Sequence, residues 1–245
     1  MSDLTKDAFL GGKLHLLQPK SGYRAGVDPV LLAATVEAQA GQAVLDLGCG
    51  VGTAALCLGA RVAGLSLTGV EIQPDYAELA RRNGGSDLEV IESDISSLPL
   101  ELRNRQFHHV LANPPYFDRG AGKASRDGGR ERALGEETPL NVWVKVAAKR
   151  LRPKGQAHFI HRVERLPDLL GAMRGRLGSI EVLPLNPRVD RATERVIVRG
   201  RKDGRASFKL HAPLIMHEGP KHLRDGDSFV ASVRAALREG KALYF

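Results

Sequence analysis

The stretch Ala43–Gly52, AVLDLGCGVG, decides how this chain folds. A short apolar run that contains one acid, Asp46, leads directly into three glycines at alternate positions, Gly48, Gly50 and Gly52. This order predicts a buried strand that ends in a tight loop. Glycines at this spacing let the backbone turn sharply and approach a ligand closely, because no Cβ stands in the way.

A helix and a second strand are expected after the loop. The segment 53–64, TAALCLGARVAG, has the apolar positions of a helix, and Ser66–Val70 is typical of a strand. Strand, glycine loop and helix form the opening unit of a nucleotide-type α/β site. Glu71 follows the second strand, nineteen positions beyond Gly52. A carboxylate at the tip of that neighbouring strand suits a ribose diol.

The acid Asp46 indicates which ligand the loop would hold. A dinucleotide would place its diphosphate on the loop, where a carboxylate repels it. S-adenosylmethionine has no phosphate and carries a sulfonium and an ammonium group, which an acid attracts. The charges therefore favour S-adenosylmethionine over a nicotinamide cofactor.

Length and composition predict one domain. The 245 residues, 42% of them hydrophobic, can bury a full core, so we expect a single domain over 1–245, with 1–40 an extension covering the pocket and 206–245 a tail. No apolar run approaches the roughly 20 residues of a membrane span. The polar start, MSDLTKDAF, predicts no secretory signal, and we expect a cytoplasmic protein.

The charge of the chain points to a polyanionic partner. The formal net charge is +8, and the segment 145–209 holds seventeen Lys and Arg residues against six acids. Such a local excess favours nucleic acid over a small acidic ligand.

The N-terminal region combines a hairpin candidate with a helix. The segment 9–29, FLGGKLHLLQPKSGYRAGVDP, could form a hairpin over a pocket, and Val30–Ala40 has the character of a helix. Asp28 before Pro29 is either the N-cap of that helix or a contact near the cofactor. Arg24 is either a substrate contact or a solvated charge.

A second informative stretch is FHHVLANPPYF, in which a strand ends at Ala112. Asn113, Pro114, Pro115 and Tyr116 follow, at the edge of a doubly wound sheet where ligands bind. Two consecutive prolines make a rigid corner that presents carbonyl groups. With an asparagine before it and an aromatic ring after it, this corner offers a planar amine two acceptors and a face to stack on.

Four motifs in order, DLGCGVG, GVEI, ESDI and NPPY, resemble those of class I S-adenosylmethionine-dependent methyltransferases. Two further segments, GKLHLLQPKSGYRAGVDPVLLAA and RVIVRGRKDG, are similar to the bacterial tRNA1(Val) adenine-N6 methyltransferase group. The resemblance covers about 22–201. It implies an α/β fold with a doubly wound, seven-stranded, mostly parallel sheet and a C-terminal antiparallel hairpin, for which the strand candidates are 180–185 and 195–199.

The resemblance also implies roles for individual residues. The Asn113 side chain and the Pro114 carbonyl would accept hydrogen bonds from the amine, with Pro115 in the same rigid corner and Tyr116 stacking on the base. Phe117 either extends that stacking surface or belongs to the core. On the cofactor side the residues are Asp46 with the backbone of Gly48 and Gly50 for the methionine part, Glu71 with Ile72 for the ribose end, and Asp94 with Ile95 for the adenine. Asp94 has the alternative of a turn-forming residue.

Two cationic segments are candidates for RNA contact. The Gly-rich, charged segment 118–139 predicts a loop over the pocket mouth, in which Arg126, Arg130 and Arg132 either hold phosphates or keep the loop soluble. The segment 187–195, with Arg188 and Arg191, is either a second RNA contact or a solvated hairpin tip.

The function expected from these residues is methyl transfer from S-adenosylmethionine to an exocyclic amine, with adenine N6 of tRNA as the acceptor. A glutamine amide presents the same planar NH2, so protein glutamine-N5 methylation is the alternative, and a non-catalytic RNA-binding or cofactor-sensing module is a third. No metal site is predicted. We expect a monomer or a homodimer.

Overall fold

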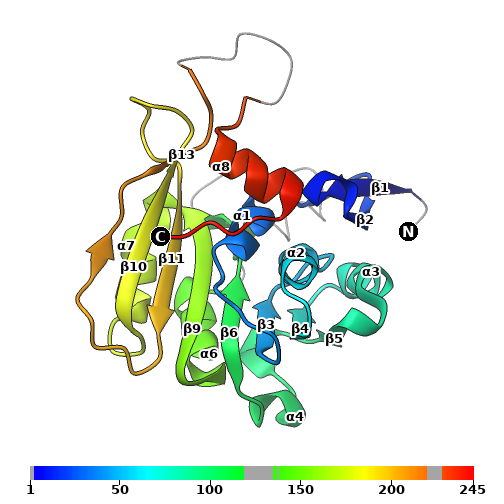
Figure 1. Ribbon diagram of the computed structural model, residues 1–245. Helices are drawn as coiled ribbons and strands as arrows, with labels where there is room; N and C mark the ends of the chain where they lie inside the picture. Colours follow the sequence, from blue (N-terminus) through cyan, green and yellow to red (C-terminus); the bar gives the residue numbers. More distant parts are fainter. Residues whose placement is uncertain (1–2, 119–134, 137, 220–227) are drawn as a thin grey trace.

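The computed structural model of the chain describes residues 3–118, 135–136, 138–219 and 228–245, and its centre is one large sheet (Figure 1). Its strands are β3 (Ala43–Leu47), β4 (Ser66–Glu71), β5 (Leu88–Glu92), β6 (Phe107–Ala112), β9 (Leu151–Arg162), β10 (Gly178–Asn186), β11 (Arg195–Arg201), β12 (Lys209–Leu210) and β13 (Leu214–Ile215). The order across the sheet is β12-β10-β11-β9-β6-β3-β4-β5, and β13 also pairs with β10.

Most of the sheet is parallel, and its strand order reverses at β3. The strands β4 and β5 follow on one side of β3, and β6 and β9 on the other, all with parallel pairing. β11 is antiparallel to both of its neighbours, β9 and β10. The predicted doubly wound, mostly parallel sheet with a C-terminal hairpin is confirmed, and the short strands β12 and β13 add to its β10 edge.

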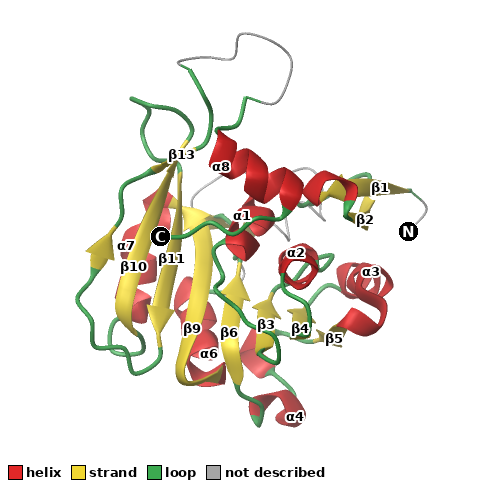
Figure 2. Ribbon diagram, in the orientation of Figure 1, coloured by secondary structure: helices red, strands yellow, loops and turns green. Residues whose placement is uncertain are grey.

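Helices cover both faces of the sheet (Figure 2). They are α1 (Asp28–Ala34), α2 (Thr53–Arg61), α3 (Pro74–Gly84), α4 (Leu100–Arg103), α6 (Leu140–Arg150), α7 (Leu166–Met173) and α8 (Ala231–Arg234), which a π-helical turn, η5 (Ala235–Glu239), continues. The short 3-10 helices are η1 (Leu10–Gly12), η2 (Gly85–Asp87), η3 (Ile95–Ser97) and η4 (Val163–Arg165). None of the described helices is long and apolar enough to cross a membrane.

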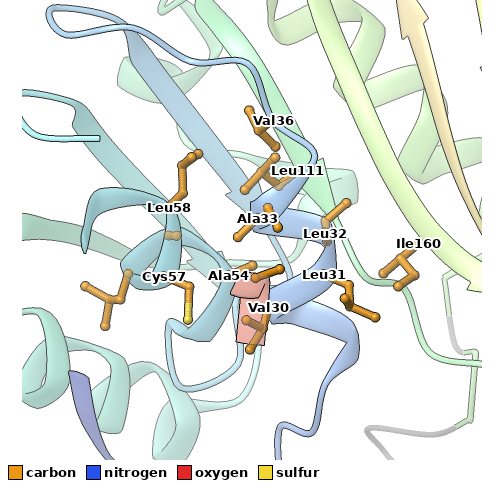
Figure 3. Packing of buried hydrophobic residues seen from close by; sticks show 14 of the residues in the cluster. Val30, Leu31, Leu32, Ala33, Val36, Ala54, Cys57, Leu58, Leu111 and Ile160 are labelled. Carbon is orange, nitrogen blue, oxygen red and sulfur yellow. The ribbon is translucent and has the colours of Figure 1, made fainter. Parts of the chain in front are cut away.

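The two faces of the sheet bury separate sets of side chains, because successive residues of a strand point to opposite faces. In β3, Val44 packs with α1 and α2, whereas Leu45 packs with α6 and α7. Figure 3 shows the first of these clusters, in which α1 and α2 meet Leu111 of β6 and Ile160 of β9. The apolar pattern of the strands thus sets which helix layer each residue supports.

The first helix is shorter than its sequence predicts, because it ends at Ala34 rather than at Ala40. Carbonyl groups at its end accept hydrogen bonds from outside the helix. The Arg61 guanidinium donates to the carbonyls of Ala33, at 3.0 Å, and Val36, and the Leu243 amide donates to the Ala34 carbonyl at 2.8 Å. These tertiary bonds replace the donors that a longer helix would supply.

An N-terminal hairpin is present, formed by β1 (Leu4–Phe9) and β2 (Leu14–Pro19). Its second strand lies inside the predicted segment 9–29, whereas its first strand lies almost entirely before that segment. The Asn83 side chain of α3 anchors it: it accepts from the Leu17 amide at 2.7 Å and donates to the carbonyls of Leu17 and Val51, at 3.1 and 3.0 Å. Because Val51 lies in the glycine loop, the hairpin is tied directly to that loop. A further pair, β7 (Phe117–Asp118) and β8 (Gly135–Glu136), is parallel.

The buried leucine of β6 offers a test of this core. Leu111 is fully buried beneath α1, so Leu111→Ala is expected to lower the free energy of unfolding by about 2–5 kcal/mol. Leu100→Ala removes the same atoms from an exposed position and should change it by no more than about 0.5 kcal/mol. Urea denaturation of both variants measures the difference, and equal effects would contradict this packing.

Candidate active site

The glycine loop between β3 and α2 has a backbone that other residues adopt only under strain. Gly48, Gly50 and Gly52 have φ values of 65°, 57° and 88°, in the left-handed region. A Cβ on Gly48 would lie 2.6 Å from an atom of the Trp143 ring, so the ring of α6 packs directly on the backbone. The predicted strand and tight loop are confirmed in this form.

A cavity open to solvent lies beside this loop at the carboxyl ends of β3, β4 and β6. This is the edge at which open α/β sheets bind ligands. The residues that line it are Tyr23, Ala25, Pro29, Asp46, Gly48, Cys49, Gly50, Val51, Thr53, Ala54, Glu71, Ile72, Gln73, Tyr76, Asn113, Pro114, Pro115, Tyr116 and Trp143. The structure therefore brings together the glycine loop, Glu71 and the NPPY segment, as the sequence predicts.

Glu71, the last residue of β4, ties its own strand to the glycine loop. Its Oε2 atom accepts from the Gly50 amide and its Oε1 atom from the Gln73 amide, both at 2.9 Å. Burial raises the pKa of this carboxyl group above its ordinary value, although the two amides oppose the change. The next side chain, Ile72, is 52% exposed at the cavity wall and offers an apolar surface to a ligand.

Asp46 is a second buried acid in the same cavity, with 3% of its surface exposed. Its Oδ2 atom accepts from the Ala55 amide at 3.2 Å. Burial raises the pKa of this carboxyl group to about 7, and the nearby Glu71 adds to the effect. Within the described part of the chain, neither acid has an ion pair with a Lys or Arg side chain, so a cationic ligand would relieve their repulsion.

Asn113 follows β6 and contributes an unused acceptor to the cavity. Its Oδ1 atom is buried and has no hydrogen-bond partner among the residues that the structure describes, and its Nδ2 group lies 3.5 Å from the Tyr23 hydroxyl. A buried acceptor without a partner is costly, and an N–H group of a ligand would satisfy it. The residues present thus fit both a cationic cofactor and an amine substrate.

Tyr116 is held by residues from two other parts of the fold. Its hydroxyl donates to the Asp28 Oδ2 atom, which also forms an ion pair with Arg195 Nε at 2.9 Å. The ring packs against His161, with centroids 5.4 Å apart and planes at 54°. Asp28 is therefore not the N-cap: Val27 has that position, without a side-chain bond. The carboxylate bonds across the fold, to Tyr116 and Arg195, rather than to its own helix.

Three aromatic residues that line the cavity were not predicted as site residues: Tyr23, Tyr76 and Trp143. The Tyr76 hydroxyl accepts from the Tyr23 amide at 2.9 Å and donates to the Tyr23 carbonyl at 3.1 Å, which holds the segment before α1 against α3. Trp143 packs on Gly48 and donates to the Thr138 carbonyl at 3.1 Å. Tyr23 lies in the segment GKLHLLQPKSGYRAGVDPVLLAA, whose similarity to a known group was the one signal for it, whereas Tyr76 and Trp143 lie in none of the motifs singled out in the sequence.

The structure places several other predicted residues away from this cavity or in structural contacts. Asp94 accepts from the Ser96 amide at 2.7 Å and so caps η3, and neither Asp94 nor Ile95 is among the described residues lining the cavity. Their adenine contact stays a prediction. Arg24 donates to Thr5, Pro19 and Asp7 within the N-terminal segment.

The predicted RNA-contacting arginines also differ in their surroundings. Arg188 is buried and donates to the carbonyls of Glu218 and Gly219, the latter at 2.9 Å, whereas Arg191 is exposed. Arg126, Arg130 and Arg132 lie outside the described residues, and of Phe117 only the backbone is described. Among the residues described, no group of three or more His, Cys, Asp or Glu side chains could hold a metal ion.

The sequence matches the family model of the methyltransferase small domain over residues 25–183. The chain therefore belongs to the methyltransferase small domain family, and the predicted class of S-adenosylmethionine-dependent methyltransferase is confirmed. It is 35% identical over 196 residues to a tRNA1(Val) (adenine(37)-N6)-methyltransferase of Porphyromonas gingivalis, covering 73% of this chain and 76% of that protein. A protein of the same name in Haemophilus influenzae is 30% identical, covering 62% and 67%.

Solved structures show the same fold. A protein of Agrobacterium tumefaciens, described as a predicted O-methyltransferase, superposes with a TM-score of 0.73 at 26% identity, over 89% of this chain and 99% of that one. The 16S rRNA N2 G1207 methyltransferase of T. thermophilus, in complex with AdoMet and guanosine, gives a TM-score of 0.56 at 21% identity, over 81% of this chain and 50% of that one.

The raised pKa of Asp46 predicts a pH-dependent stability. Because the carboxyl pKa is about 7 in the folded protein, against 3.8 for an unperturbed aspartic acid side chain, the wild-type protein loses stability as the pH rises from about 4 to 7. Asp46→Asn removes this loss, so the variant should become more stable than the wild type by roughly 2–4 kcal/mol at pH 8. Near pH 4 the two should differ little.

Urea denaturation at pH 4.5, 6 and 8 measures this difference. Asp87→Asn removes the same charge from an exposed position and serves as the control. A stability gap between wild type and Asp46→Asn that does not change with pH would show that the burial of Asp46 carries no such cost.

Proposed function

We propose that the protein transfers a methyl group from S-adenosylmethionine to N6 of adenine in tRNA. The observation that carries the proposal is the buried, unpartnered Oδ1 atom of Asn113, which lines one cavity with Pro114, Tyr116 and the two unpaired acids. An exocyclic amine would supply the N–H group that this atom lacks. The names of the relatives, tRNA1(Val) (adenine(37)-N6)-methyltransferase, support adenine N6 as that amine.

The cofactor side of the cavity would be formed by the glycine loop and the two acids. When bound, S-adenosylmethionine supplies a methyl group already activated by its positive sulfur. Asp46 would attract the positive charges of the cofactor, and the Glu71 carboxylate would accept from the ribose hydroxyls with the lone pairs that Gly50 and Gln73 leave unused. Ile72 would cover the apolar side of the nucleoside.

The acceptor side must orient a weak nucleophile, because the lone pair of an adenine amine is delocalised into the ring. The Asn113 Oδ1 atom and the Pro114 carbonyl would each accept one N–H bond and so aim the amine nitrogen at the methyl group. Tyr116 would stack on the base. The cavity walls would exclude water from the reacting atoms.

Charge supports an RNA substrate over a protein. The net charge is +8, and an exposed cation such as Arg191 would neutralise phosphates, as would Arg126, Arg130 and Arg132. Arg24 already has a carboxylate partner, Asp7. An RNA substrate also agrees with the expected cytoplasmic location. Protein glutamine would use the same acceptors, so the substrate needs a direct test.

The test is incubation with methyl-labelled cofactor and one acceptor at a time. We expect label in unmodified tRNA and none in a translation release factor, because the acceptor must reach the site through a cationic surface. Digestion of the labelled tRNA should yield N6-methyladenosine. Label in the release factor alone would overturn the proposal, and 2′-O-methylated nucleosides would refute the amine assignment.

Substitutions on the two sides of the cavity should affect different quantities, kcat on the acceptor side and the Kd for the cofactor on the other. Asn113→Ala removes the amine acceptor and is expected to lower kcat by about 10²–10³-fold while the Kd for the cofactor changes only a few-fold. Glu71→Ala removes the ribose acceptor and should mainly weaken cofactor binding, measured by isothermal titration. Asn104→Ala, at an exposed position, is the control, and the reverse pattern would refute these roles.

A further inference from the structure

The acid Asp28 and its partner Arg195 lie outside the NPPY segment but contact its tyrosine. Asp28 is the first residue of α1, and Arg195 is the first residue of β11. Arg195 forms an ion pair with the Asp28 Oδ2 atom, and the same atom accepts a hydrogen bond from the Tyr116 hydroxyl. Asp28 and Tyr116 are 88 positions apart in the chain, so the contact is a tertiary one.

We propose that Asp28 and Arg195 are positioning residues that fix the ring of Tyr116 for the acceptor base. A tyrosine ring can rotate about two side-chain bonds, and stacking on a base requires one orientation. The hydroxyl is held by Asp28, and His161 packs at the ring with a centroid distance of 5.4 Å. Tyr116 still lines the cavity, where the base would stack.

The topology explains why Arg195 can take part. The carboxyl ends of β6 and β9 meet at one edge of the sheet, and β11 runs antiparallel to β9, so β11 begins at that same edge. Arg195 pairs with Arg162 in the ladder, next to His161. The start of β11 therefore places the Arg195 guanidinium beside Asp28, the residue that binds Tyr116.

The burial of Asp28 is hard to explain by stability alone. Its side chain is 12% exposed, and its Oδ1 atom is buried without a hydrogen-bond partner in the described part of the chain. A buried carboxylate with one unsatisfied oxygen costs free energy that an N-cap or a solvated acid would not. Such costs are expected where a side chain holds a functional group in place. The burial of Tyr116 and the charge of Asp28 also raise the pKa of the Tyr116 hydroxyl, which therefore stays a donor.

This inference rests on the proposed function, because it assigns the ring of Tyr116 to stacking on the methylated base. A double-mutant cycle tests it. Tyr116→Phe removes only the hydroxyl, and Asp28→Ala removes its acceptor. Each is expected to lower kcat on the order of tenfold to a hundredfold, the loss typical of one charged hydrogen bond, while the Kd for S-adenosylmethionine stays within about twofold.

The double variant distinguishes positioning from a general structural role. If Asp28 acts through the Tyr116 hydroxyl, adding Asp28→Ala to Tyr116→Phe costs little further kcat. Losses that multiply, or an Asp28→Ala variant with wild-type kcat, would overturn the proposal. Should Asp28→Ala fail to fold, Asp28→Asn and Arg195→Ala take its place, because each breaks the ion pair that holds the Asp28 carboxylate. Each is expected to lower kcat by less than Tyr116→Phe does and to cost little further kcat in the Tyr116→Phe background, and wild-type kcat in both would overturn the proposal.

A matched control and the choice of acceptor complete the design. Glu37 forms an ion pair with Arg199 of β11 at 2.9 Å, which also joins the α1 region to β11 but involves no NPPY residue. Glu37→Gln should leave kcat unchanged. The cycle is run on whichever acceptor the wild type labels, tRNA or release factor. A protein acceptor would thus refute the proposed function while the coupling between Asp28 and Tyr116 is still measured.

Discussion

The hydrogen bond from the Gly50 amide to the Glu71 carboxylate joins the loop after β3 to the end of β4, in the part of the cavity proposed to hold the cofactor. Gly50 has a left-handed backbone, with φ at 57°, and its amide lies 2.9 Å from the Glu71 Oε2 atom at the tip of β4. The Gln73 amide holds the other oxygen of the same carboxylate. The strand end, the loop and the start of α3 are thereby fixed relative to one another before any ligand binds.

The fold places two acidic side chains in the protein interior. Glu71 and Asp46 are both buried, and burial raises the pKa of each carboxyl group. A protein under selection for stability alone would pair or remove such acids. A cationic methyl donor would provide the missing partner, so the same residues that destabilise the free protein would contribute to cofactor affinity.

The sequence predicted those site residues that lie within one short segment and missed those that reach the site from distant segments. The glycine loop, Glu71 and the NPPY segment each lie within a short motif at the end of a strand, so strand periodicity and glycine spacing pointed to these segments. The seven-stranded sheet with its C-terminal hairpin was implied by the resemblance to class I methyltransferases. Tyr23, Tyr76 and Trp143 reach the cavity only through tertiary packing, which no local pattern encodes. The local pattern at Asp28 even favoured a cap, because Asp-Pro is a common helix start, and the contact with Tyr116 decided otherwise.

The two proposed sides of the cavity therefore differ in how far apart in the sequence their residues lie. The cofactor side is formed by one strand, loop and helix unit together with the tip of the neighbouring strand. The proposed acceptor side gathers Tyr116 from the segment after β6, Asp28 from α1, Arg195 from β11 and His161 from β9. Arg195 lies there because β11 runs antiparallel to β9 and begins at the edge where β9 ends. Substitutions of the Asp28 or Arg195 side chain would thus alter how the proposed acceptor is held, while the bond between Gly50 and Glu71 involves neither residue. That separation gives a physical reason why one sheet and one cofactor loop can be combined with different methyl acceptors.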